Sequence, residues 1–178
     1  MKRENREQWK AAQNLSDVRE LTARWLTGEL EEHPGYPGGP PDQETAPIAD
    51  RLAEINRQGL LTTQSQPGHE GDDYAQSAWV QGLGAEEHVR ELQRRVQDAN
   101  MQARIAPPAT EHRFHRTRFD DGTKGWSAGT VGDMAGPTIS NGVLNEVMGQ
   151  WQFEAQDPAS CQETYLFDVM AQRDEDEA

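Results

Sequence analysis

The order of elements in the middle of the chain constrains the fold more than any other feature. The apolar pattern predicts a short strand at residues 78–81, a helix at residues 85–99 and a second strand at residues 101–105. One face of the helix is apolar at the spacing of helix turns, through Val89, Leu92 and Val96. Strand, helix and strand within about 28 residues is the size of a βαβ unit. We therefore expect the chain to fold around a small sheet.

Two helices are predicted before this unit, separated by a long loop. The first spans residues 16–27. The second begins at Thr45, has Pro47 in its first turn and ends at Gly59. Residues 28–45, which connect them, contain too many prolines and glycines for a regular element.

The remaining elements are short and polar. A strand is predicted at residues 60–63, followed directly by a polar turn at residues 64–68. The elements expected after the central unit are a strand at residues 111–119, a glycine-rich loop at residues 125–137, a helix around residues 139–151 and a last helix that begins at Asp157.

Together these elements predict a single-domain α+β fold, with about five helices around a small sheet of three or four short strands. The length of 178 residues fits one domain, and a hydrophobic content of 34% leaves enough apolar side chains for one modest core. We expect residues 1–14 to be a flexible N-terminus, residues 15–171 to form the domain, and residues 172–178 to be an acidic disordered tail.

Charge and hydropathy exclude several classes of function. Seventeen basic against 31 acidic residues give a net charge of −14, so no direct binding to duplex DNA is expected. No apolar run is long enough to cross a membrane, and the basic start of the chain leads into no apolar segment of a secretory signal. With Cys161 as the single cysteine, no internal disulfide framework is expected. The sequence is typical of a cytoplasmic protein.

The catalytic motifs in the sequence are incomplete, and we predict no catalytic residue, no metal site and no cofactor. Residues 125–129 match the G-x-S-x-G of serine hydrolases, but the required later histidine is absent. Residues 82–84 (Gly-Leu-Gly) precede a helix, but Glu86 and Glu87 disfavour a bound phosphate there. His112 and His115 would point to opposite faces of a strand and could not share a metal ion.

Two polar clusters suit a ligand. On the strand at residues 111–119, Arg116 and Arg118 would share one face and Arg113 and His115 the other, so two arginines lie close enough to grip a phosphate or carboxylate. These arginines could equally neutralise acids of their own domain. The second cluster is the polar segment at residues 62–68, whose hydroxyl and amide groups can bind an uncharged polar ligand or satisfy the backbone of their own turn.

Three blocks of the sequence resemble an uncharacterised protein family found in actinobacteria and in their phages and plasmids. The blocks are residues 21–28 (LTARWLTG), 33–36 (HPGY) and 55–68 (INRQGLLTTQSQPG), within a similarity that covers roughly residues 15–83. The pattern is a helix with W-L-x-G, a P-G-Y loop, and then N-R-x-G-x-x-T-x-x-S-Q-P-G. The resemblance implies no particular reaction. It implies a characteristic site formed by Asn56, Thr63, Ser65, Gln66 and Gly68.

The sequence therefore supports one main reading of function and two alternatives. The first is a non-enzymatic binding protein, encoded by a phage or mobile element, that holds a small polar or nucleotide-like ligand between the polar segment and the arginine strand. The second is an acidic protein–protein inhibitor or DNA mimic directed at a basic partner enzyme. The third is an enzyme acting on a nucleotide, with His115 as its acid–base group.

Overall fold

The computed structural model describes residues 2–34, 39–70, 75–76, 78–99, 101–108, 113–118, 124–129, 135–139, 143, 146–147 and 149–156. The helices within these residues are α1 (Arg3–Ala11), α2 (Leu15–Leu26), the 3₁₀ helix η1 (Ala46–Ile48), α3 (Ala49–Arg57) and α4 (Glu86–Asp98). The strands are β1 (Leu60–Gln66), β2 (His69–Glu70), β3 (Ala75–Gln76), β4 (Trp79–Gly84), β5 (Gln102–Ala106), β6 (Arg113–Arg118), β7 (Lys124–Gly129), β8 (Ala135–Ile139) and β9 (Trp151–Gln156).

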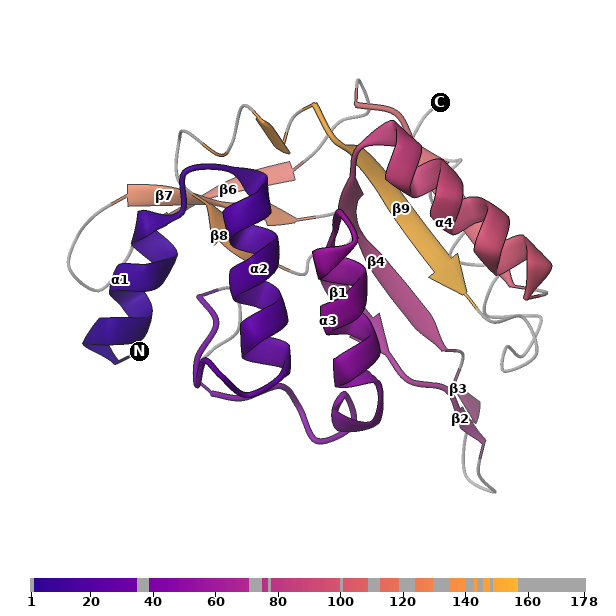
Figure 1. Ribbon diagram of the computed structural model, residues 1–178, viewed down its shortest axis with the longest axis horizontal. Coiled ribbons are helices and arrows are strands. Elements are labelled where there is room, and N and C mark those ends of the chain that lie inside the picture. The colour runs from indigo at the N-terminus through magenta and orange to yellow at the C-terminus, as the bar shows by residue number, and fades with distance from the viewer. Residues whose placement is uncertain are drawn as a thin grey trace.

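The centre of the fold is a four-stranded sheet in the order β1-β4-β9-β5. Each strand is antiparallel to its neighbour, so β4 and β5 run parallel with β9 between them. The predicted strand–helix–strand unit is therefore present as β4, α4 and β5, but it is split by a strand from much later in the chain. Figure 1 shows β4 and β9 side by side, with α4 beside them.

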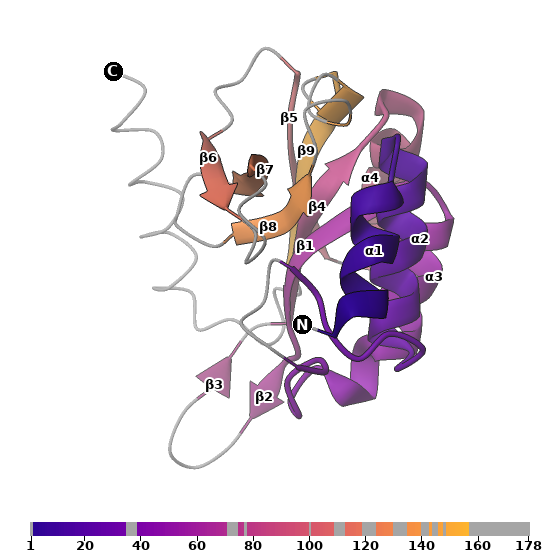
Figure 2. The ribbon, with the colours of Figure 1, turned by 90° about the vertical axis from the view of Figure 1, so that its left-hand side faces the viewer.

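The helices cover one side of this sheet, and a second sheet covers the other. In Figure 2 the four helices lie on one side, and the three-stranded sheet β6-β7-β8 lies on the opposite side. Val89 of α4 packs with Leu60 of β1 and Phe153 of β9 in one apolar cluster. A larger cluster joins α1, α2 and α3 to β1 and β4, and Val143 and Val147 belong to it. The prediction of an α+β domain is confirmed.

The beginning of the chain is part of this core. We expected residues 1–14 to be flexible, but residues 3–11 form α1, and Trp9 of that helix is buried. The indole N–H of Trp9 donates to the backbone carbonyl of Glu32, 3.2 Å away. An aromatic side chain that buries its ring and satisfies its polar end stabilises a helix far more than helix propensity does.

The prediction of about five helices was slightly too high, because the described residues contain four α-helices. The predicted strand at residues 60–63 continues to Gln66, where residues 64–66 pair with residues 79–81. The predicted glycine-rich loop at residues 125–137 was wrong, since β7 and β8 occupy most of it. Strand β7 pairs on both sides, and the two ladders hold a glycine-rich segment in an extended conformation. The last predicted helix, Cys161 and the tail at residues 172–178 lie outside the described residues.

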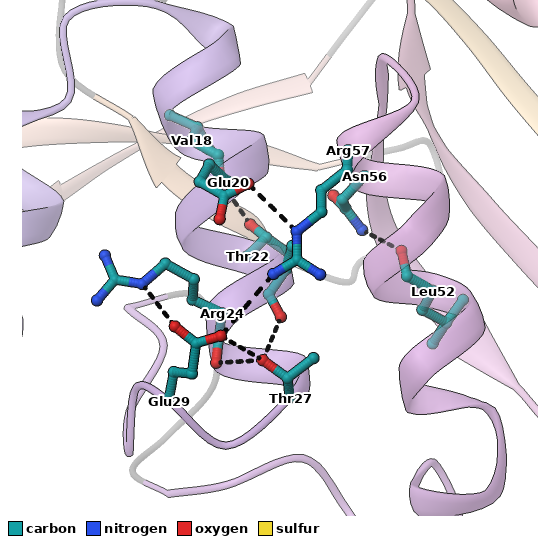
Figure 3. A network of polar contacts seen from close by, with 10 residues as sticks. Val18, Glu20, Thr22, Arg24, Thr27, Glu29, Leu52, Asn56 and Arg57 are labelled. Atoms are coloured by element: carbon teal, nitrogen blue, oxygen red, sulfur yellow. Dashed lines mark hydrogen bonds and ion pairs between the residues drawn. The ribbon is translucent and has the colours of Figure 1, made fainter.

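Ion pairs join α2 and α3 on their outer surface. Arg57 of α3 lies 3.4 Å from a carboxylate oxygen of Glu20 and 3.9 Å from one of Glu29, while Arg24 lies 3.3 Å from Glu29. Figure 3 shows these side chains meeting between the two helices. All are partly or largely exposed, so we expect each pair to contribute well under about 1 kcal/mol.

Candidate functional site

A pocket lies where the C-terminal half of α2 and the loop after it meet strand β1. It is an open depression, and its volume of about 410 Å³ includes solvent-filled space outside its walls. Its walls come from α2, from the loop at residues 28–45, from α3 and from four consecutive residues of β1. The described residues that line it are Thr22, Trp25, Leu26, His33, Asp42, Thr45, Leu52, Thr62, Thr63, Gln64 and Ser65.

An irregularity in β1 explains why consecutive residues line the same pocket. Thr62 pairs with Gly82 and Gln64 pairs with Gln81, so the ladder has one extra residue on β1 at this point. In a regular strand neighbouring side chains point to opposite faces, whereas a bulge turns one of them and bends the strand. Bulges are frequent beside functional sites for this reason. The residues of the bulge, Thr62, Thr63 and Gln64, are all buried.

His33 lies against two tryptophans, of which Trp25 also lines the pocket. Its ring centroid lies 4.6 Å from that of Trp9 and 4.7 Å from that of Trp25. The side chain is 3% exposed, and burial lowers the pKa of His33 from 6.5 to about 3. His33 is therefore neutral at pH 7 and brings no positive charge to the pocket.

Indole hydrogen bonds hold the two described parts of the loop at residues 28–45. The Trp9 indole binds the carbonyl of Glu32, and the Trp25 indole donates to the carbonyl of Gly39, 2.9 Å away. The N–H of Thr45 donates to the carbonyl of Asp42 at 2.8 Å, which closes a turn beside the pocket. These hydrogen bonds hold the described loop segments against the helices.

Asn56 joins α3 to β1 behind the pocket. Its amide nitrogen donates to the carbonyl of Leu52 at 2.8 Å and to the hydroxyl of Thr62 at 2.7 Å. Its amide oxygen accepts from the N–H of Thr62 at 3.2 Å. Asn56 is fully buried, and Figure 3 shows its amide directed back at its own helix. These bonds give Asn56 a structural role in orienting the Thr62 wall.

Asp42, Thr45 and Ser65, three other polar residues of the pocket, have no such role. No side-chain hydrogen bond or ion pair joins Asp42, Thr45 or Ser65 to another residue in the described part of the chain. The hydroxyl of Thr22 donates to the carbonyl of Val18 at 2.8 Å, and that of Thr63 donates to the carbonyl of Gln81 at 3.3 Å. Hydroxyls that donate to the backbone keep lone pairs with which they accept hydrogen bonds.

The structure brings together some of the predicted site residues and separates others. Thr63 and Ser65 line the pocket, and Asn56 lies behind it. Gln66 ends β1 opposite Trp79, and Gly68 is an exposed residue beyond that strand, so neither is among the described lining residues.

The arginine strand is confirmed as β6, but it belongs to the other sheet. Arg113 pairs with Gly129, His115 with Ser127, Arg116 with Trp126 and Arg118 with Lys124 along the backbone. The side chains of β6 lie outside the description. None of the described residues that line the pocket comes from β6.

The remaining motifs fall on regular structure. Residues 125–129, which match G-x-S-x-G, belong to strand β7 instead of a turn between a strand and a helix. Gly82 and Gly84 lie inside β4, where an added Cβ on Gly82 would be 2.1 Å from the carbonyl oxygen of Leu61. This close packing explains why both positions are glycine, since a larger side chain would not fit there. Within the described residues no three His, Cys, Asp or Glu side chains gather as metal ligands, and no helix is both long and apolar enough to span a bilayer.

Sequence reasoning missed the part of the pocket contributed by α2 and the loop. Trp25 was placed only in the helix predicted at residues 16–27, and His33 and Asp42 only in the loop at residues 28–45. A signal was present, because the three blocks of the resemblance contribute most of the lining. Residues 21–28 supply Thr22, Trp25 and Leu26, residues 33–36 supply His33, and residues 55–68 supply the β1 wall.

Comparison with known proteins agrees with that resemblance. The family described as Domain of unknown function (DUF6919) matches residues 4–113, which is well over half of the chain and contains every described lining residue of the pocket. A search of the curated proteins found no match. The chain belongs to the DUF6919 family, and the family's matched region holds the whole described pocket.

Proposed function

We propose that this chain is a non-enzymatic binding protein that holds a small polar or nucleotide-like molecule in the pocket between α2, the loop at residues 28–45 and β1. The observation that carries the proposal is the set of pocket groups that the fold leaves without a side-chain partner among the described residues: Asp42, Thr45 and Ser65. Sites for small molecules combine an apolar wall with a few polar groups that fix the ligand's orientation.

The rigidity of the pocket supports the same proposal. Its two loop walls are anchored by indole hydrogen bonds and its β1 wall by the bonds of Asn56. A preformed site avoids most of the entropy cost of ordering side chains and loops when a ligand binds.

Binding fits the lining better than catalysis does. A general base works best with a pKa near the operating pH, and the pKa of the buried His33 lies at about 3. Asp42 is exposed and has no histidine, serine or cysteine paired with it among the described residues.

The acidic-inhibitor reading has less support from the helices. On α3 and α4 the exposed carboxylates alternate with arginines and pair with them, as Glu54 does with Arg51 and Glu91 with Arg95. A surface that imitates the phosphates of DNA needs rows of unpaired negative charge instead.

Native mass spectrometry of the purified full chain tests the proposal. We expect a retained mass of a few hundred daltons that is lost at high collision energy, or the same adduct after incubation with a small-molecule extract of cells. Ser65→Ala should weaken the adduct, whereas Ser16→Ala, an exposed serine of α2 outside the pocket, should not. A bare chain after both treatments, or equal loss in the two variants, would contradict the proposal.

A further inference from the structure

The charge of the pocket favours cationic ligands over anionic ones. Asp42 is the one acidic residue among the described lining residues, which include no lysine or arginine, and His33 is kept neutral by burial. The chain as a whole carries −14. Both the local and the overall field therefore repel a phosphate or carboxylate and attract a cation.

The hydrogen-bonding capacity of the pocket points the same way. A carboxylate only accepts, so Asp42 offers acceptors alone. The protons of the Thr22 and Thr63 hydroxyls are directed to backbone carbonyls. Thr62 differs, because its hydroxyl accepts from Asn56 and keeps its own proton for donation. Asp42 and Thr22 therefore offer acceptors to a ligand group that is rich in N–H donors, while the hydroxyls of Thr45, Thr62 and Ser65 can donate to its other groups.

Ammonium and guanidinium groups are such donors. An ammonium has three N–H bonds and a guanidinium five, and neither accepts a hydrogen bond. Charge-assisted bonds to a carboxylate are about twice as strong as bonds between neutral groups.

We propose that the ligand of this pocket is a small cationic molecule whose ammonium or guanidinium group binds Asp42, while its hydroxyl or amide groups contact the threonine and serine wall. This inference rests on the proposed function. It narrows the ligand class and excludes the phosphate of a nucleotide from the pocket.

Two series of probes, each with a neutral, an amino and a phosphorylated member, test the inference by calorimetry with the full chain at pH 7. One series is adenosine, 5′-amino-5′-deoxyadenosine and adenosine 5′-monophosphate. The other is glucose, glucosamine and glucose 6-phosphate. In at least one series we expect the amine to bind about tenfold more tightly than the neutral molecule, and the phosphate to bind most weakly.

Variants of one turn give the matched control. Asp42→Asn should remove the preference for the amine, whereas Glu44→Gln should keep it, because Glu44 is an exposed acid two residues away that does not line the pocket. Both substitutions remove one acidic group from the same turn, so a difference between their effects on binding must come from direct contact between Asp42 and the ligand.

The outcomes distinguish the inference from the proposed function. Tighter binding of the phosphates, equal binding of the three charge states, no binding of either amine at millimolar concentration, or an equal effect of the two variants would overturn the inference. A ligand retained in native mass spectrometry would still uphold the proposed function in each of those cases. Loss of that adduct's dependence on Ser65 would overturn the proposed function itself.

Discussion

Acidification should destabilise this protein through His33. In the folded chain the imidazole is enclosed by Trp9 and Trp25 and is almost fully buried. Burial penalises the charged form and lowers the pKa of His33 from 6.5 to about 3. Between those two values the unfolded chain binds a proton that the folded chain does not bind. The contribution of His33 to stability is thus complete above pH 6.5 and is lost progressively as the pH falls towards 3.

The magnitude follows from the two pKa values. Each pH unit within this window changes the free energy of unfolding by about 1.4 kcal/mol. From pH 6.5 to pH 5 the expected loss is therefore about 2 kcal/mol, and the full loss near pH 3 is about 5 kcal/mol. A domain of this size has a free energy of unfolding on the order of 5–15 kcal/mol, so the loss at pH 5 is a large share.

Urea denaturation at pH 7 and at pH 5 measures this effect in the wild type and in His33→Gln. The variant is expected to be less stable at pH 7, but its free energy of unfolding should fall by about 2 kcal/mol less between the two pH values. Carboxylates titrate in both proteins and cancel in the comparison.

Two results would refute the reasoning. One is a parallel fall in stability for the wild type and His33→Gln, which would mean that His33 takes up no proton on unfolding in this range. The other is an NMR titration of the folded wild type in which His33 gains its proton above pH 5. The second measurement needs no variant, so the argument can be tested even where His33→Gln does not fold.

Three further predictions concern the packing that supports the pocket, and chemical denaturation measures each. Gly82→Ala should lower the free energy of unfolding by at least about 2 kcal/mol, because its Cβ would lie 2.1 Å from a backbone carbonyl oxygen of β1. Gly149→Ala is the control: its Cβ would lie no closer than 3.5 Å to another atom, so the free energy of unfolding should change by less than about 0.5 kcal/mol. Equal effects of the two substitutions would contradict the packing argument. Asn56→Ala should lower the free energy of unfolding by about 2–4 kcal/mol, because it removes three buried hydrogen bonds. The double variant Asn56→Ala/Thr62→Val should lose less free energy of unfolding than the two single variants lose together. Full additivity would show that the two side chains act separately. Arg57→Ala should cost less than about 1 kcal/mol, and a larger loss would mean that its exposed ion pairs act as a strong network.

Local pattern predicted the elements whose signals are local. The helix predicted at residues 16–27 is α2 to within one residue, and the side chain of Asn14 caps it by accepting from the N–H of Asp17. Gly59 ends α3 with a φ of +102°, a conformation that glycine adopts readily. Here a few adjacent residues determine the conformation, and one sequence suffices to recognise them.

The sheet order could not be predicted in this way. Strand β9 lies between β4 and β5, although residues 151–156 are far from both along the chain. Its position depends on long-range pairs such as Gly82 with Phe153 and Ile105 with Phe153. The missing Cβ of Gly82 admits the Phe153 ring, but hydropathy periodicity shows only that a glycine is present. The same limit caused β7 to be read as a loop.

The sequence predicted only part of the candidate site, for a related reason. The polar residues from Gln64 onward were predicted to form a turn, since a polar run at the end of an apolar one ordinarily leaves the sheet. In the structure residues 64–66 stay in β1 and pair with residues 79–81 of β4, and Gln64 is buried. Burial of polar side chains is tolerated where partners exist, and those partners are remote in sequence.

Two roles were open for this polar segment from the sequence, and the structure shows the structural one at Thr62 and Thr63. Thr62 and Thr63 hydrogen-bond to the protein, which is sufficient reason for them to be polar. That reason does not extend to Ser65, Thr45 or Asp42, which come from β1 and from the loop and line one pocket without a side-chain partner in the described structure. We propose that a ligand binds these polar groups, which converge from separate segments and are not paired in the described structure. If Ser65→Ala and Asp42→Asn both leave stability unchanged and both weaken capture of the same small molecule, the two roles are separate in the protein as they are in its hydrogen bonds.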